Sequence, residues 1–160
     1  DQGDAHVVTM PTPRRHRPLL LALLLALAAG APVASANGTL AFEDAWIRFV
    51  PGGAPMAGYV TVINPGDAPR RLVAARSDAF ARIMMHRSVV RDGQSSMEHV
   101  AGVDVPPGGR ARFEPGGLHL MLMGAERPVS VGDTLEIELR LEDGSRHVVP
   151  FEVRPIGAGG

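Results

Sequence analysis

The sequence has 160 residues, a formal net charge of −1 at pH 7 and no cysteine. Its length suits one domain, and its near-neutral charge gives no reason to expect nucleic acid as a partner. Without a thiol the sequence can form neither a disulfide nor a blue-copper site, and it offers no cysteine for lipid attachment.

The first 36 residues are predicted to be upstream residues followed by a cleaved secretory signal. Arg14, Arg15 and Arg17 precede an apolar run at 19–29, and Ala34-Ser35-Ala36 is typical of a cleavage site. The apolar run is far shorter than the roughly 20 residues that a membrane-spanning helix needs. We therefore expect an exported, periplasmic domain over residues 37–156, a flexible tail at 157–160, and no membrane span after cleavage.

Short runs of alternating apolar residues, broken by Gly, Pro and Asp, recur from residue 37 onward and predict β-strands. The connections between these runs are too short for crossover helices. The predicted fold class is therefore all-β, an antiparallel β-sandwich or small Greek-key barrel. The predicted strands are residues 40–50, 58–64, 71–75, 82–90, 97–103, 110–114, 118–123, 134–141 and 146–153.

Residues 118–123 read Leu-His-Leu-Met-Leu-Met, with leucine at every second position and His or Met between the leucines. On a strand this period of two points the leucines into the core and projects His119, Met121 and Met123 from the opposite face. One interpretation is a second packed layer, in which methionine fills gaps. The other is a metal site, which a second cluster upstream favours.

The second cluster consists of Met84-Met85-His86 and Met97-Glu98-His99, joined by a loop that contains Asp92-Gly93. A hairpin centred on that turn places His86 opposite His99 and Met97 opposite Ser88. His86 and Met97 are then diagonal neighbours on one face, within reach of a shared ion. A register slip of one residue would turn them to opposite faces.

Imidazole and thioether together are an informative pair of ligands. Thioether sulfur is soft and prefers Cu(I), whereas neutral imidazole accepts either oxidation state of copper. The combination predicts reversible binding of copper, with Cu(I) preferred and Cu(II) also accepted.

The ligand spacing resembles that of the periplasmic copper chaperones of the PCuAC family, whose signature is His, ten residues, Met, twenty-one residues and His-x-Met. His86, Met97, His119 and Met121 match it without a gap. The resemblance extends through Asp44-Ala45-Trp46, Gly58-Tyr59, Pro115-Gly116-Gly117 and Gly132-Asp133. Arg87 departs from it, because the family has an acidic residue after the first histidine.

The resemblance implies a cupredoxin-like β-sandwich that binds Cu(I) through these four ligands and serves cytochrome c oxidase assembly. The implied recipient is the copper-centre subunit of the oxidase or a thioredoxin-like Sco protein. We expect a monomeric binding and transfer protein, not an enzyme. The alternatives are a metal-free structural or interaction sandwich and a copper-dependent redox enzyme, although the motif contains no general base.

Several neighbouring residues have weaker assignments. Met123 and His99 are accessory ligands in one interpretation, and a packing residue and a surface residue in the other. Met85 is expected to fill the core, because it faces away from His86. Trp46 and Tyr59 are expected to be core aromatics.

Overall fold

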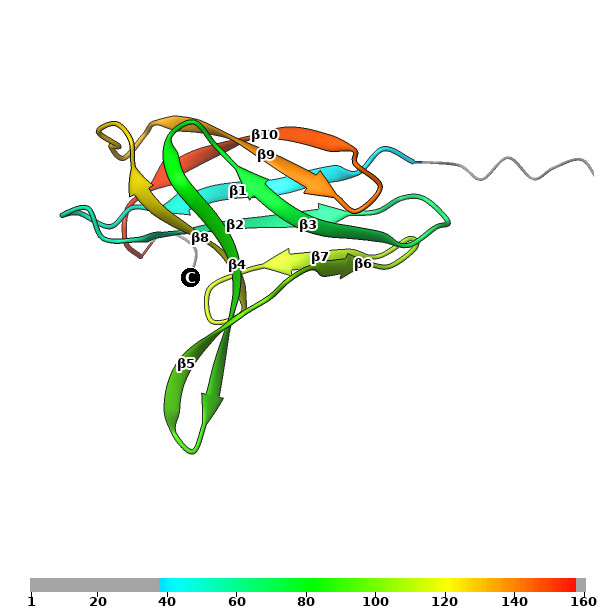
Figure 1. Ribbon diagram of the computed structural model, residues 1–160, viewed down its shortest axis with the longest axis horizontal. Helices are drawn as coiled ribbons and strands as arrows, with labels where there is room; N and C mark the ends of the chain where they lie inside the picture. The colour runs from blue at the N-terminus through cyan, green and yellow to red at the C-terminus, as the bar shows by residue number, and fades with distance from the viewer. Residues whose placement is uncertain (1–37, 158–160) are drawn as a thin grey trace, which may run out of the picture. The chain divides into compact units, whose positions relative to one another are not determined.

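The computed structural model describes residues 38–157, which form an all-β domain (Figure 1). The predicted fold class is confirmed. The predicted signal segment lies outside the described residues, as does all of the predicted tail except Gly157. Among the residues described, no helix is long and apolar enough to cross a membrane. The strands are β1 (Ala41–Arg48), β2 (Met56–Ile63), β3 (Arg70–Arg76), β4 (Phe80–Arg91), β5 (Gln94–His99), β6 (Val103–Val105), β7 (Arg110–Phe113), β8 (Leu118–Ala125), β9 (Thr134–Leu141) and β10 (Arg146–Arg154).

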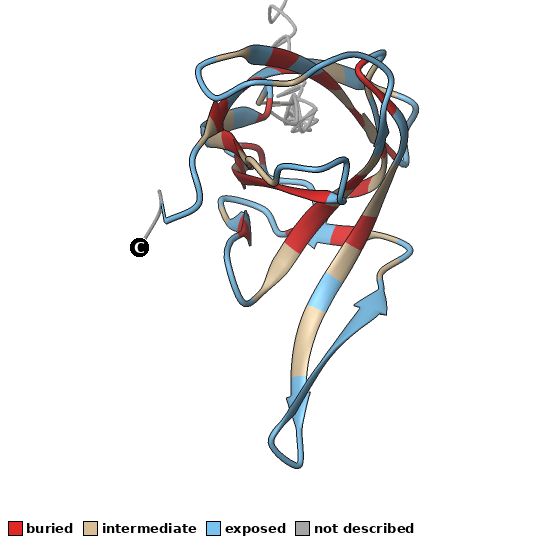
Figure 2. Ribbon diagram, turned by 90° about the vertical axis from the view of Figure 1, so that its left-hand side faces the viewer, coloured by how far each residue is buried: buried red, intermediate tan, exposed pale blue. Residues whose placement is uncertain are grey.

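The strands follow the order β5-β4-β8-β7-β2-β1-β10-β9-β3-β6 in one continuous hydrogen-bonded sheet. The sheet folds over so that β3 lies against β4 and β6 against β7, which encloses the core between two layers (Figure 2). Its pairs are antiparallel as predicted, with two exceptions, because β1 pairs with β10 and β7 with β8 in parallel. Fully buried side chains such as Ile47, Leu120, Ile137 and Phe151 fill the space between the layers.

The single strand predicted at 97–103 is wrong, because the chain changes its partner there. Residues up to His99 pair with β4, whereas β6 begins at Val103 and pairs with β3 at the other end of the strand order. The three residues between them carry the chain from one layer to the other. Alternating polarity alone does not reveal such a change of partner.

A β-bulge in β1 determines on which face of the sheet the two aromatic residues are buried. One extra residue is inserted between Glu43 and Trp46, and Asp44 there has φ 51°. The bulge reverses the alternation, so Trp46 shares the outer face of the sheet with Tyr59. Both are buried, which confirms that they are core aromatics, and with Ala57 they form a second core cluster separate from the main one.

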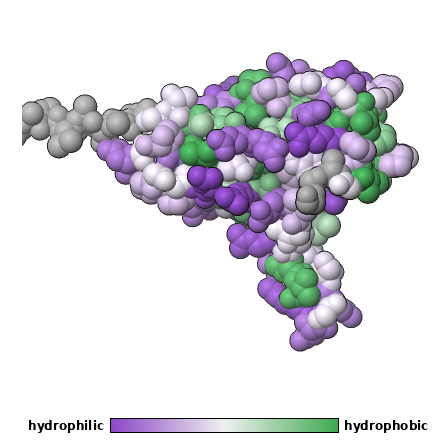
Figure 3. Space-filling model, turned by 180° about the vertical axis from the view of Figure 1, so that it is seen from behind, coloured by the Kyte–Doolittle hydropathy of each residue, from purple (hydrophilic) through white to green (hydrophobic). Residues whose placement is uncertain are grey.

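The hairpin of β4 and β5 projects from the body of the domain (Figure 1). Asp92 and Gly93 form its turn with positive φ values of 52° and 77°, the conformation that favours an Asp-Gly hairpin. All residues of β5 are exposed, and apolar surface is visible on the hairpin in Figure 3. Val90 is 73% and Met97 60% exposed, so the hairpin offers apolar groups to solvent.

Candidate metal site

Three strands place histidine side chains on one face. In the β4–β5 ladder His86 lies opposite His99 and Ser88 opposite Met97, which confirms the predicted register. On its other side β4 pairs with β8, where His86 lies opposite His119. Residues directly opposite one another in an antiparallel ladder point to the same face. The predicted ligands therefore share a face although they come from three separate strands.

The predicted alternation in β8 is confirmed. Leu120 and Leu122 are buried in the main core, whereas Met121 and Met123 are half-buried on the other face. His119 lies on that outer face too, yet it is only 6% exposed. Its burial comes from its surroundings on the outer face and not from the main core.

A cleft on the outer face brings together three of the four predicted ligands. Met97, His119 and Met121 line it. His86 lies beside it, and its ring centroid is 6.0 Å from that of His119. The other residues that line the cleft are Arg48, Pro55, Met56, Ala57, Tyr59, Ser88 and Gly116.

His119 is oriented by the backbone of the turn that precedes its strand. Its Nδ1 lies 3.2 Å from the carbonyl oxygen of Gly117. Because a carbonyl oxygen only accepts, Nδ1 must carry the hydrogen and donate it. The lone pair is then on Nε2, which is the tautomer that many metal-binding histidines adopt when a backbone carbonyl holds the other nitrogen.

His86 carries a buried nitrogen without a partner. Its Nδ1 has no hydrogen-bond partner, although buried polar atoms nearly always have one. Desolvation by burial lowers the pKa of His86, and the neighbouring His119 and His99 lower it further. A lowered pKa keeps the imidazole neutral, and neutral imidazole is the form that binds a metal. An unpaired, neutral nitrogen on the same face as Met97 and Met121 suits a soft cation.

The four predicted ligands differ in their access to solvent. His119 is buried, His86 and Met121 are half-buried, and Met97 is 60% exposed on the projecting hairpin. The site is therefore open to solvent on the side where Met97 lies.

Three further residues bear on the ligand set. Met123 pairs with Arg82 and does not line the cleft, whereas exposed His99 has its ring centroid 5.9 Å from that of His86. Sequence reasoning missed Met84, which lies opposite Met121 on the ligand face. Its spacing of two residues from His86 was the signal that could have identified it.

Two arginines cover the aromatic cluster beside the cleft. The guanidinium carbon of Arg48 lies 5.8 Å from the ring centroid of Tyr59, and that of Arg154 lies 5.6 Å from Trp46. The two aromatic rings are 4.7 Å apart. Since Arg48 and Tyr59 also line the cleft, this stack forms one of its walls.

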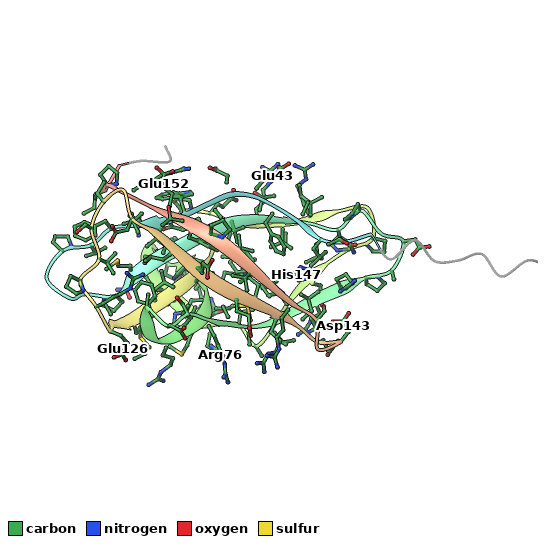
Figure 4. All side chains as sticks on the ribbon, turned by 90° about the horizontal axis from the view of Figure 1, so that it is seen from above. Glu43, Arg76, Glu126, Asp143, His147 and Glu152 are labelled. Carbon is green, nitrogen blue, oxygen red and sulfur yellow. The ribbon has the colours of Figure 1, made fainter. Side chains whose placement is uncertain are left out.

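The remaining described histidine does not line the cleft. His147 lies on β10, with Asp143 at the turn before that strand (Figure 4). Its ring packs 5.3 Å from that of Phe42, and its Nε2 is buried without a partner. Within residues 38–157, no three His, Cys, Asp or Glu side chains are positioned to hold a metal as they stand. A site with three or more protein ligands in the described residues would therefore include a methionine, a backbone oxygen or a side chain in another rotamer.

A family model described as "Putative lipoprotein LpqE-like" matches residues 40–153, which is most of the chain. The chain belongs to the LpqE-like family. A relative from Leifsonia xyli subsp. xyli (strain CTCB07), named "Putative lipoprotein Lxx21020", is 31% identical over 134 residues. That match covers 83% of the LpqE-like chain and 80% of the relative.

Solved structures also resemble the LpqE-like chain. The copper-bound PCuAC domain from PmoF2 has a TM-score of 0.62 and 25% identity, over 75% of this chain and 96% of that domain. The Cu(I) form of DR1885 from Deinococcus radiodurans has a TM-score of 0.58 and 28% identity, over 79% of this chain and 85% of that protein. The predicted resemblance to PCuAC proteins is thus confirmed for the fold.

Proposed function

We propose that this protein is an extracytoplasmic copper chaperone that binds Cu(I) through His86, Met97, His119 and Met121. The observation that carries the proposal is the cleft, which gathers Met97, His119 and Met121, with the ring centroid of His86 6.0 Å from that of His119. The copper named in the two similar structures supports the choice of metal.

The chemistry of the donors favours Cu(I) over other ions. Two thioethers are soft and uncharged, so they bind Cu(I) far better than Zn²⁺, Mg²⁺ or Ca²⁺. The two neutral imidazoles bring the number of ligands to four and add no charge. The resulting complex keeps the single positive charge of the ion, which suits a cargo that is released again.

Release is favoured by the graded exposure of the ligands. Met97 is the exposed member of the set, so its sulfur can leave the ion while His119 remains in place. A ligand from a partner then enters at the open side before the other bonds break. We propose a copper-centre subunit of cytochrome c oxidase or a thioredoxin-like Sco protein as this partner, on the strength of the PCuAC resemblance.

Two arguments support a location outside the cytoplasm. Residues 1–36 have the charged, apolar and small-residue pattern of a secretory signal. The family and the curated relative both carry the word lipoprotein in their names, which fits proteins of the cell envelope.

A binding and transfer role fits the cleft better than catalysis. The residues that line it include neither aspartate nor glutamate, so none of them offers a carboxylate as a general base. The two similar solved structures are named for the copper they contain, one as a copper-bound PCuAC domain and the other as a Cu(I) form.

The proposal is tested by anaerobic competition for Cu(I) against a chelator of known affinity. The wild-type protein should bind one Cu(I), and His119→Ala and Met121→Leu should each lose at least tenfold in affinity. Far-UV circular dichroism and the thermal midpoint check that each variant is folded. Met123→Leu is the matched control on the same strand, and it should bind as wild type because Met123 lies outside the cleft. Unchanged affinity in folded His119→Ala would refute the proposal.

A further inference from the structure

His86 has an imidazole neighbour on each side. His99 on β5 and His119 on β8 both lie directly opposite it, so the three side chains form a row across three adjacent strands on one face. The ring centroids of His86 and His99 are 5.9 Å apart, and those of His86 and His119 are 6.0 Å apart. The proposed Cu(I) site uses two of these rings and leaves His99 without a role.

The separation of the His86 and His119 rings suits a shared ion. A metal bound by imidazole lies about 2.0 Å from the nitrogen and so roughly 3 Å from the ring centre, which allows two rings on one ion to be up to about 6 Å apart. That limit describes two trans ligands, with the ion on the line between the rings, so His86 can meet it with only one neighbour at a time. If His119 is that neighbour at 6.0 Å, His99 has to come to about 4.5 Å from both rings to bind as a cis ligand. The planes of each pair are steeply inclined, at 84° and 75°, so the rings of a pair are not stacked face to face.

One ring has to turn before all three nitrogens can meet, since no such group is formed by the side chains as they stand. His99 is the ring that is free to do so. It lies on the exposed edge strand of the projecting hairpin, and its neighbours Glu98 and Met97 are exposed as well. Rotation of an exposed side chain between staggered rotamers breaks no packing.

The same row offers copper a second kind of ligand set. Cu(II) prefers nitrogen and oxygen donors in a tetragonal arrangement, whereas thioethers suit Cu(I). Met97 and His99 are two residues apart on the same face of β5, about 6.6 Å along the strand. An ion held by His86 and His119 can therefore take either Met97 or His99 as its ligand from the hairpin.

We propose that His86, His99 and His119 form a three-imidazole site for Cu(II), which alternates with the His/Met site for Cu(I). The proposal rests on the proposed function in that the two sites share His86 and His119. Each ion is bound in the oxidation state in which it is supplied, and no electron transfer is involved. The protein would then accept copper outside the cytoplasm in either state through one cleft.

The test is a pair of titrations on the tag-free protein, with Cu(II) followed by electron paramagnetic resonance and Cu(I) followed by anaerobic competition. Wild type should show an axial Cu(II) spectrum with splitting from three nitrogens. His99→Ala should lose one nitrogen and at least tenfold in Cu(II) affinity, while its Cu(I) affinity stays within twofold of wild type. Ser95→Ala on the same strand is the control and should change neither.

Met97→Leu combined with Met121→Leu should show the reverse pattern, with Cu(I) affinity lost and the Cu(II) spectrum retained. Unchanged Cu(II) affinity and spectrum in folded His99→Ala would overturn the three-imidazole site. An unchanged Cu(I) affinity in the double methionine variant would instead overturn the proposed Cu(I) site. The two failures are therefore distinguishable, because His99 is changed in one protein and the methionines in the other.

Discussion

Substitutions at two adjacent residues of β8, Leu120 and Met121, should affect stability and copper binding separately. Leu120 is fully buried and packs closely over β2, where a Cβ added to Gly58 would lie 3.3 Å from that of Leu120. Leu120→Ala removes three carbon atoms, which is about 2.4 kcal/mol of transfer free energy at about 0.8 kcal/mol each. The two layers are held by the strand ladders and cannot close the space fully, so the cavity raises the expected loss to about 3–5 kcal/mol.

Met121 lies one position further along and faces the cleft. Met121→Leu keeps the volume of a half-buried side chain, so the loss of stability should stay under about 1.5 kcal/mol. It removes a thioether, however, so Cu(I) affinity should fall at least tenfold. Urea unfolding of the metal-free proteins at pH 7, with equal m-values, measures the first effect, and Cu(I) competition measures the second. Equal losses of stability in the two variants would refute the assignment of opposite faces.

Three further predictions concern pH and the backbone. Cu(I) affinity should be steady from pH 8 to about 6.5 and fall in more acidic solution, because protons then compete for imidazole. The contribution of His86 to Cu(I) affinity should be lost last, because its metal-free pKa is lowered, first by burial and then by His119 and His99. His86→Met should therefore make the decline of affinity with falling pH shallower. A flat wild-type profile from pH 8 to 4 would exclude imidazole ligands. Burial also lowers the pKa of His147, and Arg70 adds to the effect. As the pH falls below about 6.5, the imidazole of His147 is therefore protonated in the unfolded chain before it is protonated in the folded protein, and this lowers the free energy of unfolding. His147→Leu should reduce that loss in urea unfolding between pH 7.5 and 5, and identical slopes would contradict the role of His147. Finally, Asp44 has a φ of 51°, in the region that glycine adopts freely. Asp44→Gly should therefore leave the thermal midpoint nearly unchanged, whereas Asp44→Val should lower the free energy of unfolding by about 1–2 kcal/mol. Equal midpoints in the two variants would show that the backbone conformation at the bulge does not limit stability.

The sequence predicted those parts of the fold that depend on local pattern. Alternation in residues 118–123 identified the core face and the ligand face of β8, and the Asp92-Gly93 turn fixed the register that places His86 opposite His99. Both follow from the period of two, which is a property of any strand. The prediction of an all-β domain rests on the same signal repeated along the chain.

The parts that sequence could not predict depend on irregular backbone and on distant partners. The extra residue at Asp44 turns Trp46 to the outer face, where Arg154 covers it, and no alternation rule includes a bulge. The break between β5 and β6 arises because the chain crosses between layers. The pairing of Met84 with Met121 likewise needed the β4–β8 register, which joins strands far apart in the sequence.

The central claim is that two imidazoles and two thioethers from three strands meet at one copper ion. X-ray absorption at the copper edge, on the protein loaded anaerobically with one Cu(I), measures this most directly. The account predicts a shell of two sulfur and two nitrogen neighbours, with one sulfur fewer in Met97→Leu and one nitrogen fewer in His119→Ala. A copper environment without sulfur, or one that neither substitution changes, would contradict it.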